Sequence, residues 1–229
     1  MNVPFQAIPF ILYQRTGLSS IYKIPKTLRP LFDWLTKPPV YKMYVNLDSF
    51  FRAKAISKDF SKGIEQEYNE IQPYLPPTAK KILDIGCGVG GIDALLAQRY
   101  PDAEIFLFDE TTTDKKIHYG FEKKGSFYNS LDVAKDLVEK NGGHHVTSWP
   151  VSRGFPKEKF DLVVSIMSWG AHYPVDTYLD DVYEGLNPGG IVITDLRNGT
   201  DGLDLFKSRF RSVMIISENR KSRKIAATK

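Results

Sequence analysis

Residues 81–91 read Lys-Ile-Leu-Asp-Ile-Gly-Cys-Gly-Val-Gly-Gly, and this stretch decides the fold of the chain. Its first five residues are mostly apolar and predict a buried strand. Gly86, Gly88 and Gly91 then satisfy the pattern G-x-G-x-x-G, and a helix is predicted over 92–99. The first glycine permits a tight turn, the second lets a ligand approach the backbone, and the third lets the helix pack against the strand. This order of elements indicates a site for a nucleotide-like ligand.

Two carboxylates near the loop indicate which ligand it takes. Asp109 ends a second predicted strand, where an acid accepts the ribose hydroxyls of an adenosine; a plain turn residue is the alternative, and Glu110 is the runner-up for the ribose. Asp84 lies inside an apolar strand, where a buried carboxylate needs a cation or several N–H donors. S-adenosylmethionine carries an ammonium and a sulfonium, whereas a dinucleotide has little use for an anion so near its pyrophosphate. Asp84 bonded only to backbone amides is the structural alternative.

Working outward from the loop, strands and helices alternate. Further strands are predicted at 104–108, 145–147, 160–166 and 191–194, and helices at 61–74, 130–140 and 175–186. This alternation predicts parallel, right-handed β-α-β units in one sheet. The two runs 212–217 and 224–228 flank a polar turn and predict a closing antiparallel hairpin.

The N-terminal segment has a different character. Six prolines interrupt residues 1–60, aromatic residues are frequent, and short helices are predicted at 28–35 and 45–55. A disordered tail would not carry so many aromatic residues. We therefore expect a helical or irregular cap over 1–60, packed on a main domain over 61–229.

Four motifs resemble those of class I S-adenosylmethionine-dependent methyltransferases, in the usual order and spacing. They are Leu83–Gly91, Phe106–Asp109, Phe160–Ser165 and Leu186–Ile193. The resemblance covers about residues 60–229. It implies a Rossmann-like, seven-stranded, mostly parallel sheet with helices on both faces and a C-terminal antiparallel hairpin. It also implies that Asp109 holds ribose and that S-adenosylhomocysteine is the product. The acid that the family often carries after the third strand is missing, so no residue is assigned to the adenine.

The segment after the fourth strand is the predicted place of catalysis, because ligands bind at the carboxyl ends of the strands in open α/β sheets. It reads Met-Ser-Trp-Gly-Ala-His-Tyr-Pro over 167–174. His172 is the candidate general base for a hydroxyl acceptor, since imidazole titrates near neutrality. Tyr173 and Trp169 are expected to shape the acceptor pocket, and Met167 to lie on the cofactor side. A loop histidine bonded to backbone is an equal alternative for His172.

Arg197, after the fifth strand, is a candidate for pairing with a phosphate or carboxylate of the acceptor, and a salt bridge to a nearby acid is equally favoured. No metal site is predicted, because the adjacent pair His144 and His145 lacks metal-ligand spacing. The fourth strand is not followed by Asn/Asp-Pro-Pro-Tyr/Phe, which argues against methylation of exocyclic amines. The leading hypothesis is methyl transfer to a hydroxyl of a small molecule or saccharide. Methylation of nucleic acid, a non-catalytic methyltransferase-like binding domain and a dehydrogenase are the alternatives.

Charge and composition limit the remaining classes. Residues 1–60 carry nine Lys and Arg against three Asp and Glu, and residues 207–229 carry eight against one, so a middle with excess acid lies between basic ends. Dedicated nucleic-acid binders have a basic domain, which makes nucleic acid the less favoured partner. The single cysteine, Cys87, fits a reducing cytoplasmic setting. No stretch approaches the roughly 20 apolar residues of a membrane helix. The oligomeric state is not predicted.

Overall fold

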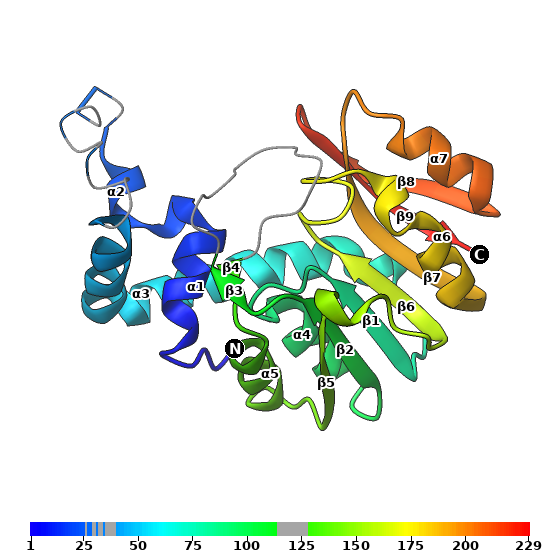
Figure 1. Cartoon of the computed structure of the whole chain (residues 1–229), viewed down its shortest axis with the longest axis horizontal. Coiled ribbons are helices and arrows are strands. Elements are labelled where there is room, and N and C mark those ends of the chain that lie inside the picture. Colours follow the sequence, from blue (N-terminus) through cyan, green and yellow to red (C-terminus); the bar gives the residue numbers. More distant parts are fainter. Residues whose placement is uncertain (26, 29–30, 32–33, 35–39, 114–127) are drawn as a thin grey trace.

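The computed structural model describes residues 1–25, 27–28, 31, 34, 40–113 and 128–229. A seven-stranded sheet runs through the larger part of the chain in the order β5-β2-β1-β6-β7-β9-β8 (Figure 1). The strands are β1 (Lys81–Ile85), β2 (Glu104–Asp109), β5 (His145–Pro150), β6 (Phe160–Ser165), β7 (Leu186–Arg197), β8 (Ser212–Glu218) and β9 (Ser222–Thr228). A short pair, β3 (Thr112–Thr113) and β4 (Tyr128–Asn129), lies apart from it.

The first five strands of the sheet pair in parallel, and the hairpin of β8 and β9 pairs antiparallel with β7 and with itself. This confirms the predicted mostly parallel sheet with a reversed C-terminal hairpin. The predicted fifth strand was too short at both ends, since β7 begins at Leu186 and ends at Arg197. The predicted helix over 175–186 is correspondingly shorter and is divided into the 3-10 turn Val175–Thr177 and α6 (Leu179–Gly185).

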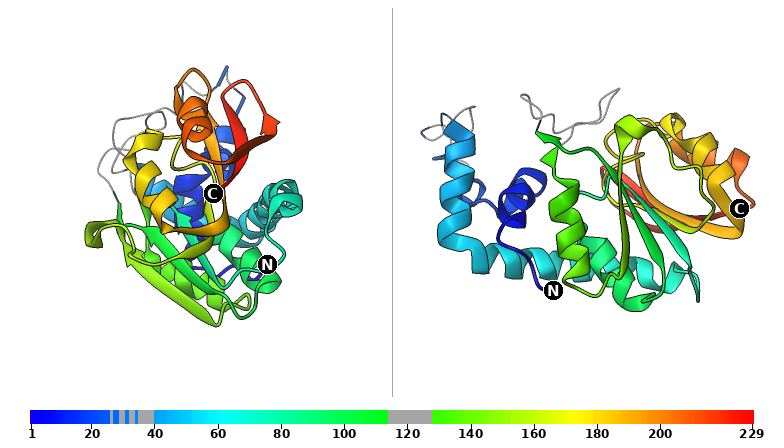
Figure 2. Two further views of the ribbon diagram at one scale, coloured as in Figure 1. Left: turned by 90° about the vertical axis from the view of Figure 1, so that its right-hand side faces the viewer. Right: turned by 60° about the horizontal axis from the view of Figure 1, so that its bottom comes forward.

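Helices cover both faces of the sheet, as the two turned views show (Figure 2). One apolar cluster joins one face of the sheet to α1 (Ala7–Gln14), α3 (Val40–Ile71), α4 (Gly91–Arg99) and α5 (Leu131–Glu139). A second cluster joins the other face to α6 and α7 (Gly202–Arg209). The strands between them are buried on both sides, which explains their continuous apolar runs. Ser130 caps α5 as predicted, because its hydroxyl accepts the Val133 N–H at 3.4 Å.

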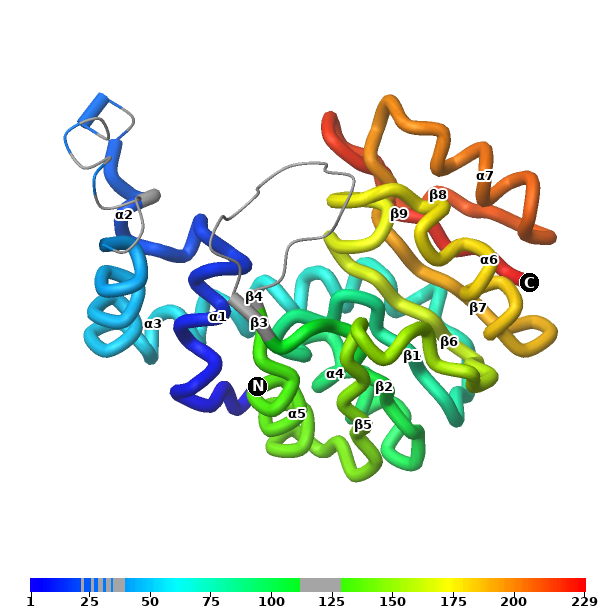
Figure 3. The backbone as a smooth tube through the Cα atoms, in the orientation of Figure 1, coloured from blue at the N-terminus to red at the C-terminus, as the bar shows by residue number. Residues whose placement is uncertain are grey.

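The N-terminal helices differ from the prediction. One helix, α3, runs from Val40 to Ile71 and replaces the two shorter helices predicted at 45–55 and 61–74; the 3-10 turn Gln72–Tyr74 follows it. Most of the helix predicted at 28–35 lies outside the described residues. The division between 1–60 and 61–229 falls inside α3, and it stays a prediction. The tube view shows α3 extending from beside the sheet to α1 and the short α2 (Ser20–Lys23) (Figure 3).

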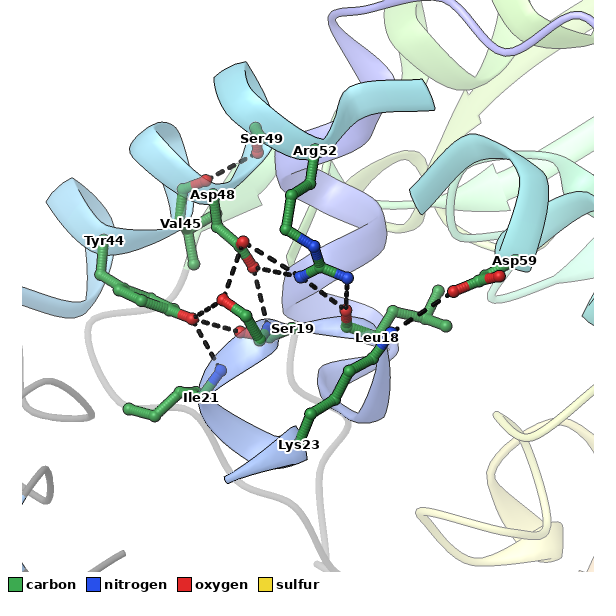
Figure 4. Close-up of polar contacts among 11 residues, drawn as sticks. Leu18, Ser19, Ile21, Lys23, Tyr44, Val45, Asp48, Ser49, Arg52 and Asp59 are labelled. Atoms are coloured by element: carbon green, nitrogen blue, oxygen red, sulfur yellow. Dashed lines mark hydrogen bonds and ion pairs between the residues drawn. The ribbon is translucent and has the colours of Figure 1, made fainter. Parts of the chain in front are cut away.

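The buried carboxylate of Asp48 connects α3 to α2 by hydrogen bonds. Asp48 on α3 accepts the Ser20 N–H at 3.0 Å and the Ser20 hydroxyl at 2.9 Å, and it pairs with Arg52 one turn later at 3.0 Å (Figure 4). The Tyr44 hydroxyl accepts the Ile21 N–H at 2.7 Å. Buried acids are stable when they are paired and hydrogen-bonded in this way, so this network joins α2 firmly to α3. No helix in the described part of the chain is long and apolar enough to span a bilayer.

Candidate functional site

The glycine loop connects β1 to α4 and is covered closely by two other segments. Gly86 and Gly88 have φ angles of 74° and 54°, in the left-handed region that favours glycine. A Cβ on Gly86 would lie 1.9 Å from Ser168 Oγ, and one on Gly88 would lie 2.6 Å from Gln14 Oε1. The space above the second glycine, predicted to admit the ligand, is therefore occupied by a side chain from α1.

The third glycine has a different role from the predicted one. A Cβ on Gly91 would come within 2.7 Å of Ile64 Cδ1 and 2.8 Å of Phe60 Cζ. Both side chains belong to α3, so Gly91 makes room for the long N-terminal helix rather than for close packing of α4 on β1. The close packing of α3 against the glycine loop therefore depends on the missing side chain of Gly91.

Asp84 faces a second acid that the sequence analysis did not assign. Asp93, in the first turn of α4, is fully buried, and its carboxyl acts directly on that of Asp84. Asp84 Oδ1 and both carboxyl oxygens of Asp93 have no hydrogen-bond donor among the described residues. Burial raises the pKa of both groups, and the neighbouring acids add to this for Asp84. A buried acidic pair without a cation fits a ligand that brings a positive charge.

Asp109 stabilises the loop from the next strand. Its Oδ2 accepts the Gly88 N–H at 2.9 Å and the Asn129 side-chain N–H at 3.1 Å, while Oδ1 accepts the Glu110 N–H at 2.7 Å. Burial raises the pKa of Asp109 to about 6, against these hydrogen bonds, which favour the charged form. This carboxylate therefore holds the glycine loop, and its predicted contact with ribose stays a prediction.

Asn129 and Gln14 extend this cluster to the N-terminal helix. Asn129 on β4 is buried and also donates to the Gly88 carbonyl. Gln14, the last residue of α1, donates to Asn129 Oδ1 at 3.5 Å. Thus α1, β2, β4 and the glycine loop meet through side-chain amides. The sequence analysis missed both residues, because they lie far from the motif in the chain and only the packing of α1 brings them to it.

Glu110 and Trp149 both make contacts around the end of β5. Glu110 Oε2 accepts the Ser152 N–H at 3.0 Å, so this acid holds the turn that follows β5. The Trp149 indole donates to the Gly154 carbonyl at 2.7 Å, and the Arg153 guanidinium lies 3.8 Å from the ring centroid. These contacts order the end of β5.

The turn after β6 is strained and anchored. Met167 has a φ of 55°, unfavourable for a residue with a Cβ, and its N–H donates to Asp195 Oδ2 at 2.9 Å. Asp195 is buried on β7. Burial raises its pKa, and the ammonium of Lys224 opposes that rise. Residues held in this region cluster at functional sites, where surrounding bonds maintain the strain. The Met167 side chain itself is exposed.

The strained turn brings two predicted catalytic residues close to the loop. Ser168 lies over Gly86, its carbonyl accepts the His172 N–H at 2.8 Å, and its side chain bonds to that of Tyr173. Burial raises the pKa of Tyr173, and the charges of Asp109 and Asp84 raise it further. Tyr173 therefore stays a neutral phenol that can donate a hydrogen bond. Ser168 was missed as an individual residue, although it lies in the predicted segment.

Trp169 does not lie where the sequence analysis expected it. Its side chain has no exposed surface, its indole donates to the Val175 carbonyl at 2.8 Å, and it packs on Phe206 of α7. The prediction that it shapes the acceptor pocket is wrong for this structure, because a core side chain bonded to backbone has no surface left for a ligand. Arg197, in contrast, is half-buried at the end of β7, and its N–H donates to the Gly170 carbonyl at 2.9 Å.

Comparison with known proteins agrees with this geometry. A family model described as a methyltransferase domain matches residues 51–220. A polyketide synthase-nonribosomal peptide synthetase of Aspergillus flavipes is 26% identical over 183 residues, which are 76% of this chain. The chain spans only 4% of the length of that curated relative. The family match includes the glycine loop, the turn after β6 and most of α3.

Solved structures share the fold at low identity. A precorrin-6y C5,15-methyltransferase of Geobacter metallireducens has a TM-score of 0.53 at 15% identity, covering 72% of this chain and 89% of that one. An O-methyltransferase of Thermotoga maritima has 0.50 at 16%, covering 72% and 64%. A 16S rRNA N2 G1207 methyltransferase of T. thermophilus, with S-adenosylmethionine and guanosine, has 0.51 at 16%, covering 70% and 41%.

The family match, the glycine loop and the acidic pair beside it lead to the same conclusion. The loop follows β1 and opens α4, and the buried carboxyls of Asp84 and Asp93 suit a cationic cofactor rather than a dinucleotide. The chain therefore belongs to the methyltransferase-domain family, with the class I fold and S-adenosylmethionine as its methyl donor.

Proposed function

We propose that the protein transfers a methyl group from S-adenosylmethionine to a hydroxyl of a small molecule or saccharide. The observation that carries this proposal is the strained turn after β6, which holds Ser168 over Gly86 and Tyr173 against Ser168. A hydroxyl acceptor seated here has a hydrogen-bond donor and the neighbouring His172 within one short segment. The sulfonium of the cofactor supplies a methyl group on a good leaving group, so the protein mainly has to align the acceptor and exclude water.

In the proposed cofactor site, the glycine loop at Gly86 and Gly88 offers its backbone, and Asp84 takes the ammonium. Asp109 and Glu110 remain the candidates for the ribose hydroxyls. Asp109 Oδ2 already accepts two N–H groups, whereas Oδ1 accepts one, so Oδ1 has the greater capacity left for a hydroxyl. Met167, whose backbone is held in a strained conformation, is proposed to lie on the cofactor side of the turn.

In the proposed acceptor site, His172 takes the proton of the acceptor hydroxyl and Tyr173 orients that hydroxyl by donating to it. Tyr173 is suited to donation because burial raises the pKa of its phenol. Arg197 is proposed to hold a phosphate or carboxylate of the acceptor, since it ends β7 beside the same turn. The rings of Phe155 and Tyr178 pack on Phe108 and form an apolar wall nearby.

The charges around the turn favour a small acceptor over nucleic acid. Exposed Asp176, Asp180 and Asp181 follow Tyr173 in the chain, on the 3-10 turn and the first turn of α6. A polyanion crossing this edge would meet these carboxylates, while binding of nucleic acid requires cations along the phosphate path. Nucleic-acid methylation is the second candidate, favoured by the basic N-terminal segment. Salt-dependent binding of RNA or DNA, measured between low and physiological salt, distinguishes it.

Replacing His172 with glutamine tests the general base. We expect turnover to fall by about 10²–10⁴-fold, the usual contribution of a positioned base, with little change in cofactor affinity. The measurement is homocysteine release from a panel of hydroxylated sugars and nucleotide sugars, beside calorimetry with S-adenosylmethionine. His144, exposed at the opposite end of the sheet, provides the matched control His144→Gln. Unchanged turnover of His172→Gln at saturating acceptor would remove this residue from the mechanism.

Replacing Asn129 with alanine tests the link between the N-terminal helix and the cofactor loop. The change removes one of the two N–H donors to Asp109 Oδ2 and the side-chain amide donor to the Gly88 carbonyl, at a cost of about 1–3 kcal/mol for a buried group. We expect the dissociation constant for the cofactor to rise about 5- to 100-fold, from the same range, with a smaller rise for Gln14→Ala. Calorimetry measures both. Gln66→Ala, exposed on α3, is the control, and equal affinity in all three variants would contradict the link.

A further inference from the structure

The two acids beside the glycine loop are buried without any counter-charge. Asp84 is 4% exposed at the end of β1, and Asp93 is 0% exposed in the first turn of α4. Three of their four carboxyl oxygens have no hydrogen-bond donor among the described residues. An uncompensated pair of buried charges costs far more than folding can tolerate, so the pair cannot hold two full negative charges without a cation.

The contact between the two side chains shows what replaces the cation in the free protein. The two carboxyl groups are close enough to act directly on each other's pKa, and two carboxylates have no hydrogen to share. The contact becomes a hydrogen bond only when one carboxyl keeps a proton and donates it to the other. The start of α4 favours one negative charge here, because its backbone N–H groups point toward this end. One proton and one charge on the pair are therefore the arrangement that satisfies both residues.

The other ionisable groups facing the pair do not supply a positive charge. The charge of Asp109 on β2 raises the pKa of Asp84. The charges of both acids raise the pKa of the Cys87 thiol in the loop, and the charge of Asp84 raises that of the Tyr173 phenol after β6. All three are neutral or negative. In the described part of the structure, the groups around the pair thus strengthen its hold on a proton rather than compensate its charge.

We propose that Asp84 and Asp93 share one proton in the cofactor-free protein and that binding of the cofactor's ammonium releases this proton to solvent. Asp84 contacts the ammonium, and Asp93 is a positioning residue that acts through Asp84. One cation enters and one proton leaves, so the site keeps its net charge and no covalent bond changes. The proposal rests on the assignment of the cofactor and is independent of which acceptor is methylated.

Proton release gives the cofactor affinity a defined pH dependence. Where the free pair holds its proton, each unit rise in pH lowers the dissociation constant by up to about tenfold, because binding then competes with one proton. Above the pKa of the free pair, the affinity becomes independent of pH. Burial raises the pKa of both acids, so the dependence extends toward neutral pH instead of ending near the usual value for aspartate.

The test is calorimetric titration of the full chain with S-adenosylmethionine in two buffers, phosphate and Tris, of different ionisation enthalpy. The difference between the observed enthalpies gives the number of protons released. We expect close to one for the wild type near pH 6.5 and close to none for Asp93→Asn, whose amide donates to the Asp84 carboxylate without a titrating proton. S-adenosylhomocysteine, which has the same ammonium and no sulfonium, is expected to release the same proton.

Controls separate the proposal from general effects. Asp102→Asn, an exposed acid in the turn after α4, is expected to release the proton like the wild type. No proton release by the wild type overturns the proposal, as does undiminished release by Asp93→Asn. Release with S-adenosylmethionine alone overturns the assignment to the ammonium. Absence of any binding heat with either ligand, together with no shift in melting temperature, would instead refute the cofactor assignment itself. If Asp93→Asn does not fold, the wild-type titration still decides.

Discussion

Replacing Trp169 with alanine is expected to destabilise the protein by about 3–5 kcal/mol, the cost of removing a large aromatic side chain from a core. Trp169 has no exposed surface, and the substitution also removes the donor to the Val175 carbonyl and the contact with Phe206. For a chain of this size, each kcal/mol lowers the melting temperature by about 2–4 °C. Denaturant unfolding and thermal melts measure the effect, and the melting temperature is expected to fall by about 6–20 °C.

Trp149 offers a matched control for this prediction. Its indole also donates to a backbone carbonyl, but its side chain is only half-buried and its ring is covered by Arg153. Trp149→Ala is therefore expected to cost less than half as much. If Trp169→Ala instead keeps wild-type stability and raises only the KM of the acceptor, the original hypothesis of an acceptor wall would stand and the structural assignment would fail.

Replacing Gly86 with alanine is expected to abolish cofactor binding at ordinary concentrations and to weaken the fold. A φ of 74° is strained for alanine by about 1–3 kcal/mol. The new Cβ would also lie 1.9 Å from Ser168 Oγ and 2.6 Å from Ser168 Cβ, and such overpacking costs typically about 1–3 kcal/mol more. Relief of the clash must move the loop or the turn after β6, and both carry the proposed site. Calorimetry and thermal melts measure the two effects.

Two further variants separate the clash from the strain. Gly154 has a φ of 82° with nothing within 4 Å of an added Cβ, so Gly154→Ala measures strain alone and should leave cofactor binding intact. Adding Ser168→Gly to Gly86→Ala removes the colliding atoms, and we expect it to recover the overpacking part of the stability loss. Wild-type cofactor affinity in Gly86→Ala would show that the loop does not need the close approach of Ser168.

Much of the fold was predictable from the chain because it depends on local patterns. Continuous apolar runs predicted β1, β2 and β6, and Ser130 predicted the start of α5 as its N-cap. The limits of β7 were missed because pairing with β9 extends the strand to Arg197 and pairing with β6 begins it at Leu186, beyond its apolar run at both ends. Two separate helices were predicted where α3 is continuous, since its exposed and buried faces vary along its length and only its packing on α1 and α4 makes one uninterrupted helix favourable.

The candidate site was predictable only where motif and chemistry coincide in a short segment. Asp84, Asp109 and the glycine loop lie together as expected, and Ser168 to Tyr173 lie next to them. Asp93 carried a signal that was available, namely an acid on the buried side of a helix that follows the loop. For Trp169, the sequence showed an aromatic residue in a functional segment but not whether it faces the ligand or the core.

The sequence by itself determined the parallel strands and the closing hairpin of the sheet, the glycine loop between β1 and α4, and the class of cofactor, because these depend on residues close together in the chain and on charges that a buried strand cannot leave unpaired. Only the tertiary structure decided that Gln14 and Asn129 hold the loop, that Asp93 lies next to Asp84, and that Trp169 belongs to the core. These contacts join segments distant in the chain. Their formation depends on how helices pack on both faces of the sheet, which no local pattern specifies.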